Sequence, residues 1–280
     1  MIIARTRDDL NQTLQKFTQK PGKLALIPTM GNLHDGHLSL VRLAKLNAKK
    51  TITTIFVNPL QFGKNEDFEK YPRSEEMDIN KLSKEKCDIL FIPVNRNEVF
   101  PKFEEVKKIE SGKLGNELCG KIRPGHFDGV LTVVNKIFEI IKPDIAIFGA
   151  KDYQQQILIS EMSKILHPYL TILKAPIIRS KNGVALSSRN NYLSQKEMNL
   201  ASNLFKCLEN SVKLYKDNVL LNEIIENAQK FLISKKLNPD YLELRDYKLN
   251  NINENNFNGK KVFLSSVTLN KTRLIDNIEF

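Results

Sequence analysis

Short apolar runs alternate with amphipathic stretches through the first two-thirds of the chain, and this alternation restricts the fold more than any other feature of the sequence. The apolar runs are typical of strands covered on both faces, and the stretches between them follow the period of a helix. The alternation predicts an α/β fold with a Rossmann-like, doubly wound parallel sheet. The predicted strands are residues 24–28, 51–57, 89–93, 144–149 and 171–177, and the predicted helices are residues 8–17, 38–47, 74–84, 130–141 and 154–166.

After about residue 177 the pattern changes. Ser194 and Glu197 have the spacing of a capping box, which predicts a long helix that ends near residue 215. A second helix is expected over residues 221–235, and three short strands over 241–245, 261–265 and 273–276. We therefore expect two domains: residues 1–177 form the Rossmann-like domain, and residues 178–280 form a smaller C-terminal α+β domain that closes over the ligand site.

The most informative motif lies where the first predicted strand of the sheet passes into a helix. His34 and His37 stand there at positions i and i+3, with Gly31 and Gly36 beside them. A helix N-terminus attracts anions, two imidazoles on its first turn can donate hydrogen bonds to phosphate oxygens, and glycines let the backbone approach a ligand. Capping or surface histidines are the structural alternative. A metal site is weaker, because no Cys or carboxylate completes a ligand set at suitable spacing.

Further polar side chains follow the other predicted strands. In a doubly wound sheet, the loops beyond the carboxyl ends of the strands form the ligand site. Lys151 can neutralise a phosphate, and Asp152 can accept from ribose hydroxyls or hold Mg²⁺ through water. Gln61 and Gln155 can bind a hydroxyl and a carboxylate of a small substrate. The structural alternative for each of these side chains is an ordinary solvated loop.

Two more clusters supply donors for an anion. Ser187, Ser188 and Arg189 offer two hydroxyls and a guanidinium that suits a phosphate. Arg123 and His126 flank a Pro-Gly turn and could form a mobile gate over phosphates. A capped turn and an ordinary turn are the respective structural alternatives.

Composition excludes several function classes. The net charge is +11, but the lysines are dispersed and there is no arginine-rich tract, so we expect no nucleic-acid partner. No apolar run is long enough to span a bilayer, and the N-terminal residues lack the layout of a signal peptide. Three widely spaced cysteines do not suggest a disulfide framework. We therefore expect a cytoplasmic protein with no membrane partner.

The clusters share one theme, which is a set of donors for a polyphosphate without an activated covalent nucleophile. No Walker-type Gly-x-x-x-x-Gly-Lys and no Gly-x-Gly-x-x-Gly follows a predicted strand, so a P-loop kinase and a nicotinamide dehydrogenase both fit poorly. A reaction that depends on positioning and charge stabilisation fits better, such as nucleotidyl transfer to a carboxylate.

Seven motifs follow one another over nearly the whole chain. They are PTMGNLHDGH (28–37), FVNPLQF (56–62), YPR (71–73), RPGHF (123–127), FGAKDYQQ (148–155), LSSRN (186–190) and RLIDN (273–277). In order and spacing they resemble the pantothenate synthetase (pantoate–β-alanine ligase) family. The His-x-Gly-His element alone marks only a broader nucleotidyltransferase superfamily, whereas the combination is highly specific.

The resemblance implies a reaction in which ATP, (R)-pantoate and β-alanine give pantothenate, AMP and pyrophosphate through a pantoyl-adenylate. It also implies Mg²⁺, held mainly by the ATP phosphates, and a homodimer of two-domain subunits. Two alternatives remain open at this point: an adenylyltransferase with another acceptor, and a nucleotide- or RNA-binding protein that has no catalytic activity.

The resemblance also implies roles for individual residues. Catalysis falls to His34, His37, Lys151 and Arg189, with His37 the favoured proton donor. The implied ATP contacts are Met30, Gly31, His34, His37, Gly149, Lys151, Asp152, Ile178, Leu186, Ser187, Ser188 and Arg189. The implied contacts with pantoate or β-alanine are Gln61, Gln155 and Met30, and the implied lid residues are Arg123 and His126.

The sequence departs from the family pattern at two places. Ala150 stands where the family usually has Glu or Gln, which removes a polar side chain near the ribose and predicts weakened nucleotide contacts at most. The residues before Arg273 lack an expected glycine, which affects only the local C-terminal geometry.

Overall fold

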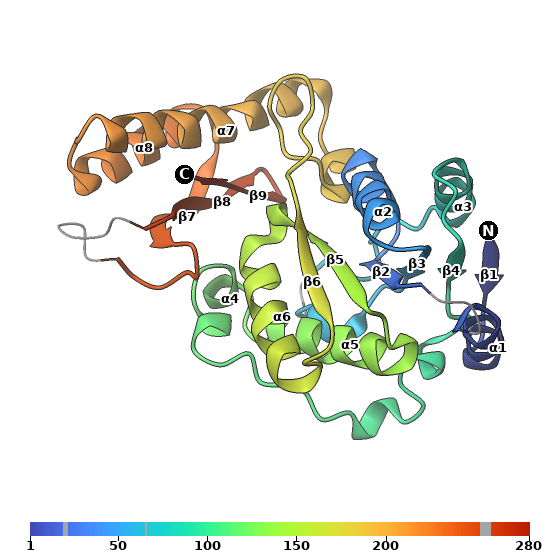
Figure 1. Cartoon of the computed structure of the whole chain (residues 1–280). Coiled ribbons are helices and arrows are strands. Elements are labelled where there is room, and N and C mark those ends of the chain that lie inside the picture. Colours follow the sequence, from blue (N-terminus) through green and yellow to red (C-terminus); the bar gives the residue numbers. More distant parts are fainter. Residues whose placement is uncertain (19–21, 65, 253–258) are drawn as a thin grey trace. The chain divides into compact units, whose positions relative to one another are not determined.

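The computed structural model describes residues 1–18, 22–64, 66–252 and 259–280, which pack as two compact units (Figure 1). The first unit comprises residues 1–150 and 155–176, and the second comprises residues 151–154 and 177–280. The short segment 151–154, which the sequence analysis placed in the first domain, therefore packs with the second unit.

The first unit is built on a six-stranded sheet with the strand order β1-β4-β3-β2-β5-β6. Every neighbouring pair is parallel, which confirms the predicted parallel sheet. The strands are β1 (Ile2–Ala4), β2 (Leu24–Thr29), β3 (Lys50–Ile55), β4 (Ile89–Phe91), β5 (Ile145–Gly149) and β6 (Thr171–Ala175). Strand β1 was not predicted, because a three-residue edge strand is too short to show a period.

Helices cover both faces of this sheet. On one face, Leu38, Val41 and Ala44 of α2 pack with Ile27 of β2 and Ile147 of β5. Phe148 alternates with Ile147 and so points to the other face, where its ring lies 6.4 Å from that of Phe138 on α5. The helices of the first unit are α1 (Arg7–Thr18), α2 (Asp35–Asn47), α3 (Glu75–Lys84), α4 (Cys119–Ile122), α5 (His126–Ile141) and α6 (Tyr153–Leu166), of which α6 begins in the segment assigned to the second unit.

The order of the strands places a topological switch between β2 and β5. The chain runs from β2 through β3 to β4 on one side and then returns to β5 and β6 on the other. Because β2, β3 and β5 are parallel, the segments that follow them leave the same edge of the sheet. Ligands of doubly wound sheets bind at this edge beside the switch point. The segments after these three strands begin at Met30, Phe56 and Ala150.

The second unit packs two helices against a three-stranded antiparallel sheet. The helices are α7 (Gln195–Lys216) and α8 (Leu221–Ser234), and the strands are β7 (Asn238–Asp246), β8 (Lys261–Leu269) and β9 (Thr272–Glu279). Leu208 of α7, Leu232 of α8 and Phe263 of β8 are fully buried in its core. The strands are longer than predicted, because they continue through polar residues that are buried in the sheet, such as Ser266 of β8 and Asn277 of β9.

Short 3-10 helices join these elements in both units. They are η1 (Pro59–Gln61), η2 (Arg96–Glu98), η3 (Phe103–Glu105), η4 (Leu114–Asn116), η5 (Ala150–Asp152) and η6 (Ser188–Tyr192). Among the helices of the described chain, none has both the length and the apolar composition needed to cross a membrane.

Candidate active site

His34 and His37 together cap the N-terminus of α2. His34 is the N-cap residue, and its Nδ1 accepts a hydrogen bond from the backbone N–H of Gly36 at 3.1 Å. His37 Nδ1 accepts from the backbone N–H of His34 at 3.3 Å, which completes a capping box made of two imidazoles. A ring nitrogen that accepts carries no proton, so each neutral ring carries its proton on Nε2. The ring centroids lie 4.1 Å apart, which places two donor rings side by side at an anion-attracting helix end.

The turn before these histidines is held by Asp78, which the sequence analysis did not find. Asp78 is 1% exposed, and its two carboxylate oxygens accept from the backbone N–H groups of Asn32 and Leu33, both at 2.8 Å. Gly31 has a φ of +82°, and a Cβ there would lie 3.2 Å from the Asp78 carboxylate. Lys81 on the same helix, α3, donates to the carbonyl of Leu33. Helix α3 therefore fixes the backbone that leads into the histidine pair.

The amide of Gln61 is oriented by Asn58. The backbone N–H of Leu60 donates to Asn58 Oδ1 at 3.1 Å, which identifies the oxygen of the Asn58 amide. The Asn58 nitrogen then donates to Gln61 Oε1 at 3.0 Å and to the carbonyl of Gly129 at 3.1 Å. Gln61 Nε2, which lies 3.1 Å from Met30 Sδ, is consequently the donor end of the amide. Gln61 thus presents N–H groups, which suit the oxygens of a carboxylate or hydroxyl.

The backbone of Gln61 approaches α5 closely. A Cβ at position 129 would lie 2.1 Å from the carbonyl oxygen of Leu60 and 2.7 Å from the nitrogen of Gln61, so only glycine fits there. His126 Nδ1 lies 2.7 Å from the carbonyl oxygen of Gln61. Helix α5 therefore sets the position of Gln61 through both steric contact and a hydrogen bond.

Arg123 and His126, which the family resemblance assigns to a lid, are engaged within the first unit. His126 is buried at the first position of α5, four residues before the predicted start of that helix. The Arg123 side chain is 9% exposed, donates twice to the carboxylate of Glu66 and lies 2.8 Å from His126 Nε2. Their role as a lid stays a prediction.

The remaining predicted residues of the first unit lie near the switch point. Gly149 is the last residue of β5, and apart from Gly149 and its two chain neighbours nothing in the described chain lies within 4 Å of the position that a Cβ would take. Ala150, the departure from the family pattern, is buried in η5. Gln155 lies in the first turn of α6 and is partly exposed.

In the second unit, a β-bridge brings Ile178 and Leu186 together. The backbone N–H of Leu186 donates to the carbonyl of Ile178 at 2.9 Å, beside the bridge between Arg179 and Ala185. Ser187 then caps η6, since its hydroxyl accepts from the backbone N–H of Arg189 at 3.3 Å. The tight turn holds Ile178, the predicted adenine contact, next to the predicted phosphate contacts.

Lys151 and Asp152 lie in the same unit. Lys151 Nζ lies 3.5 Å from Asp152 Oδ2, and the backbone carbonyl of Lys151 accepts from Asn277 Nδ2 at 3.1 Å. Next to Asn277, Asp276 is buried and accepts two hydrogen bonds from Arg179. Burial raises the pKa of the Asp276 carboxyl above its ordinary value, although the Arg179 guanidinium acts in the opposite direction. The RLIDN motif thus supports both Lys151 and the β-bridge, a function that the sequence did not reveal.

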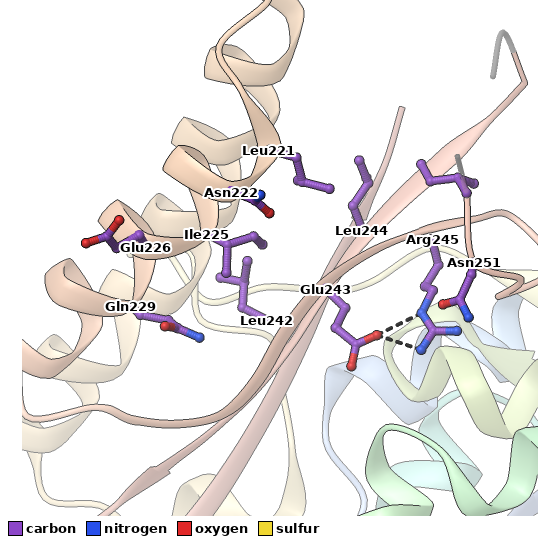
Figure 2. A pocket seen from close by; sticks show the side chains of 11 residues that line it. Leu221, Asn222, Ile225, Glu226, Gln229, Leu242, Glu243, Leu244, Arg245 and Asn251 are labelled. Carbon is purple, nitrogen blue, oxygen red and sulfur yellow. Dashed lines mark hydrogen bonds and ion pairs between the residues drawn. The ribbon is translucent and has the colours of Figure 1, made fainter. Parts of the chain in front are cut away.

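A groove of about 410 Å³ lies elsewhere on the second unit, between α8 and β7 (Figure 2). Leu221, Ile225 and Leu242 form its apolar part, and none of the predicted site residues lines it. Arg245 at its edge is paired with Glu243, with Nε–Oε2 at 2.8 Å. The described residues contain no group of three or more His, Cys, Asp and Glu side chains that could hold a metal ion.

A family model described as Pantoate-beta-alanine ligase matches residues 2–279. The chain belongs to this family. The pantothenate synthetase of Psychrobacter cryohalolentis is 43% identical over 272 residues, which are 96% of this chain and 94% of the relative. The pantothenate synthetase of Laribacter hongkongensis is 42% identical over 286 residues, which cover 100% of this chain and 99% of the relative.

Two solved structures of pantoate–β-alanine ligases have the same fold. The crystal structure of pantothenate synthetase from Thermus thermophilus matches with a TM-score of 0.91 and 32% identity, and covers 99% of both chains. The pantoate–β-alanine ligase from Francisella tularensis, complexed with β-γ ATP and β-alanine, matches with a TM-score of 0.81 and 32% identity over 99% of this chain and 97% of that one. These matches favour the ligase over the two alternatives left open by the sequence.

Proposed function

We propose that the two imidazoles at the start of α2 bind and stabilise the phosphates of ATP while this chain joins pantoate to β-alanine, the reaction that gives its family its name. The observation that carries the proposal is the capping box that His34 and His37 form at the N-terminus of α2. Both Nδ1 atoms are engaged by backbone N–H groups, so the protons of His34 and His37 are on Nε2. Donors held in this way before the ligand arrives need no reorganisation when charge develops on the phosphate.

Gln61 and Gln155 would hold pantoate. The amide of Gln61 already has its N–H end fixed as the donor by Asn58, which suits an oxygen of the pantoate carboxylate or hydroxyl. Gln155 leaves the same edge of the sheet on α6. Met30, whose sulfur lies next to Gln61, would line both this pocket and that of the nucleotide.

The family resemblance supplies further candidates for phosphate donors. Lys151, Ser187, Ser188 and Arg189 are our candidates for these contacts, and Lys151 and Arg189 would share the charge of the leaving pyrophosphate. Asp152 and Gly149 would hold the ribose, Ile178 would contact the adenine, and Leu186 is a further candidate contact with ATP. Gly31 would allow the phosphates to approach the backbone. At Ala150 a backbone contact would replace the side chain that other family members offer.

The proposed chemistry has two steps. In the first, a carboxylate oxygen of pantoate attacks the α-phosphorus of ATP in line, which breaks the bond to pyrophosphate and forms pantoyl-adenylate. In the second, the neutral amine of β-alanine attacks the acyl carbon, the bond between that carbon and the bridging oxygen breaks, and AMP leaves. The second step releases one proton from the amine. Exclusion of water would protect the mixed anhydride between the two steps.

We place Mg²⁺ on the phosphates of ATP and assign it no protein ligands. We further propose that the protein is cytoplasmic and acts as a homodimer, both on the strength of the family resemblance. Light scattering at micromolar concentration tests the second proposal, since a monomer has a mass of 32.2 kDa.

Oxygen labelling tests the chemistry. Pantoate labelled with ¹⁸O in its carboxylate should give AMP that carries one labelled oxygen, and AMP should accumulate only when ATP, Mg²⁺, pantoate and β-alanine are all present. Transfer of a phosphoryl group to pantoate would instead release ADP. Sustained production of ADP, or AMP without label, would contradict the adenylate.

A further inference from the structure

Glu66, Arg123 and His126 form a continuous chain of polar contacts that ends on the backbone carbonyl of Gln61. Arg123 Nε donates to Glu66 Oε1 at 2.6 Å, and Nη2 donates to Glu66 Oε2. Arg123 Nη1 lies 2.8 Å from His126 Nε2, and His126 Nδ1 lies 2.7 Å from the carbonyl oxygen of Gln61. All four residues belong to the first unit.

The chemistry of the groups fixes the direction of every bond in this chain. A carbonyl oxygen only accepts, so His126 Nδ1 carries a proton and donates to Gln61. A guanidinium only donates, so His126 Nε2 accepts from Arg123. His126 is therefore the neutral Nδ1–H tautomer, the opposite of the tautomer found in the His34–His37 pair. Arg123 thus donates in two directions, to the carboxylate of Glu66 and to His126, and His126 passes a donor on to Gln61.

Glu66 is the group that allows Arg123 to occupy this position. The Arg123 side chain is only 9% exposed, and the side chain of Glu66 is 25% exposed. A cation as buried as Arg123 is strongly unfavourable without a partner. Burial acts to raise the pKa of Glu66, but the bonds from Arg123 outweigh it and hold the pKa below its ordinary value, so Glu66 is an anion at neutral pH.

The segment that carries Glu66 has its own internal packing. The ring of Phe62 lies 5.3 Å from that of Phe68 and 5.9 Å from that of Tyr71, both in edge-on arrangements. The backbone N–H of Glu66, between these rings in the sequence, donates to the carbonyl of Gly63 at 3.0 Å, so Glu66 belongs to a turn rather than to an extended loop. The ion pair therefore ties a preformed turn to the start of α5.

We infer that Glu66 is a positioning residue for pantoate: through Arg123 and His126 it holds the carbonyl of Gln61, and so keeps the Gln61 amide in the orientation that binds the substrate. Glu66 itself does not touch pantoate. The inference rests on the proposed role of Gln61 as a pantoate ligand. It goes beyond that role because it makes pantoate affinity depend on a carboxylate that reaches the backbone carbonyl of Gln61 only through Arg123, which contacts that carbonyl at 3.5 Å, and His126.

Steady-state kinetics of Glu66→Gln test the inference. Loss of the charge should raise KM for pantoate about 10-fold or more, the effect of losing a hydrogen bond to a charged group, and leave KM for ATP unchanged. Arg123→Lys, which keeps the charge but cannot bridge Glu66 and His126 with a forked side chain, should do the same. Glu104→Gln is the matched control, because it breaks an exposed pair with Arg96 and should leave both KM values unchanged.

A double-mutant cycle with Gln61→Ala separates this inference from the proposed function. If Gln61→Ala alone leaves KM for pantoate unchanged, the proposed role of Gln61 fails, and the inference fails with it. If Gln61→Ala raises that KM, the effect of Glu66→Gln should disappear in the Gln61→Ala background. A full, additive effect of Glu66→Gln in that background would overturn the inference while leaving the role of Gln61 intact. The inference would also fail if Glu66→Gln alone changed KM for pantoate and KM for ATP equally and strongly lowered Tm.

Discussion

The Nδ1 atom of His37 accepts a hydrogen bond from the backbone N–H of His34 at 3.3 Å, so the two candidate catalytic rings are also the cap of the helix that carries them. A capping side chain is held in one rotamer by the backbone it serves. The rings consequently enter the reaction with their conformations already restricted, and the cost of immobilising each, about 0.5–1.5 kcal/mol, is met in folding rather than in binding.

Substitution of His37 tests whether the ring serves both as a helix cap and as a catalytic donor. His37→Ala should lower kcat about 10²–10³-fold, because one transition-state donor is lost. It should lower the free energy of unfolding by only about 1 kcal/mol, the contribution of a cap. Activity is measured as AMP release, and stability by urea unfolding.

His34→Asn separates the two roles, since asparagine is a good N-cap but does not present an imidazole Nε2–H. We expect stability close to that of the wild type together with a large loss of kcat. An active His34→Asn enzyme would mean that the ring serves only the helix.

Gln155→Ala tests the pantoate pocket. Removing the amide should raise KM for pantoate far more than KM for ATP, because uniform binding of one substrate is lost. Gln156→Ala, one residue along α6, removes a buried side chain that bonds Ser160 and serves as the control. Equal changes in KM for both substrates in Gln155→Ala would contradict the assignment.

Asp78→Asn tests the support of the turn before His34. An amide has one acceptor oxygen, so one of the backbone N–H groups of Asn32 and Leu33 would face a donor in the buried site. We expect a loss of about 1–3 kcal/mol in unfolding free energy, together with reduced kcat.

Ser74→Ala is the milder comparison for Asp78, because it removes only a hydroxyl that donates to the same carboxylate at 3.2 Å. Its unfolding free energy and kcat should change much less. A wild-type kcat in a folded Asp78→Asn protein would show that the site does not need both hydrogen bonds from the turn to Asp78.

The stability of the protein should fall on mild acidification because of His167. Burial lowers the pKa of His167 below its ordinary value, against the opposing effect of Glu139. The unfolded chain therefore binds a proton at His167 more readily than the folded chain does. The contribution of His167 to the free energy of unfolding is present above the ordinary histidine pKa near 6.5 and is lost as the pH falls below it.

The measurement compares urea unfolding of the wild type and His167→Gln at pH 5.5 and 7.5. A glutamine amide can still donate to Asn135, which His167 Nε2 contacts at 2.7 Å. The wild type should lose more stability between the two pH values than the variant does. An identical loss in both proteins would exclude His167 as the cause.

The sheet and the histidine motif were predictable because their signals are local. The apolar run before Met30 and the helical period after His37 define the strand, the turn and the helix within about twenty residues. The alternation of elements then predicts a parallel, doubly wound sheet. The structure confirms this sheet and adds β1 at its edge.

The residues that hold the site in place, Asp78 and Glu66, were not predictable, because the groups they bind are distant in the sequence. Asp78 lies 45 residues from Leu33, and Glu66 lies 57 residues from Arg123. Neither pair has a spacing or composition that distinguishes it from the many charged surface residues of this lysine-rich chain. The early start of α5 was missed for another reason: the Pro-Gly before His126 read as a loop, whereas Gly125 adopts a φ of +75° and leads directly into the helix.

The contact between Gly129 and the backbone of Leu60 also restricts which residues this position can carry in related chains. A methyl group at position 129 would occupy the place of the Leu60 carbonyl, and neither α5 nor η1 could yield without shifting Gln61. The missing side chain of Gly129 on α5 thus sets the distance between that helix and η1, which carries the substrate contact Gln61. A related chain with alanine at this position should have moved its 58–61 segment away from α5, and its affinity for pantoate would show whether that segment found another place to bind.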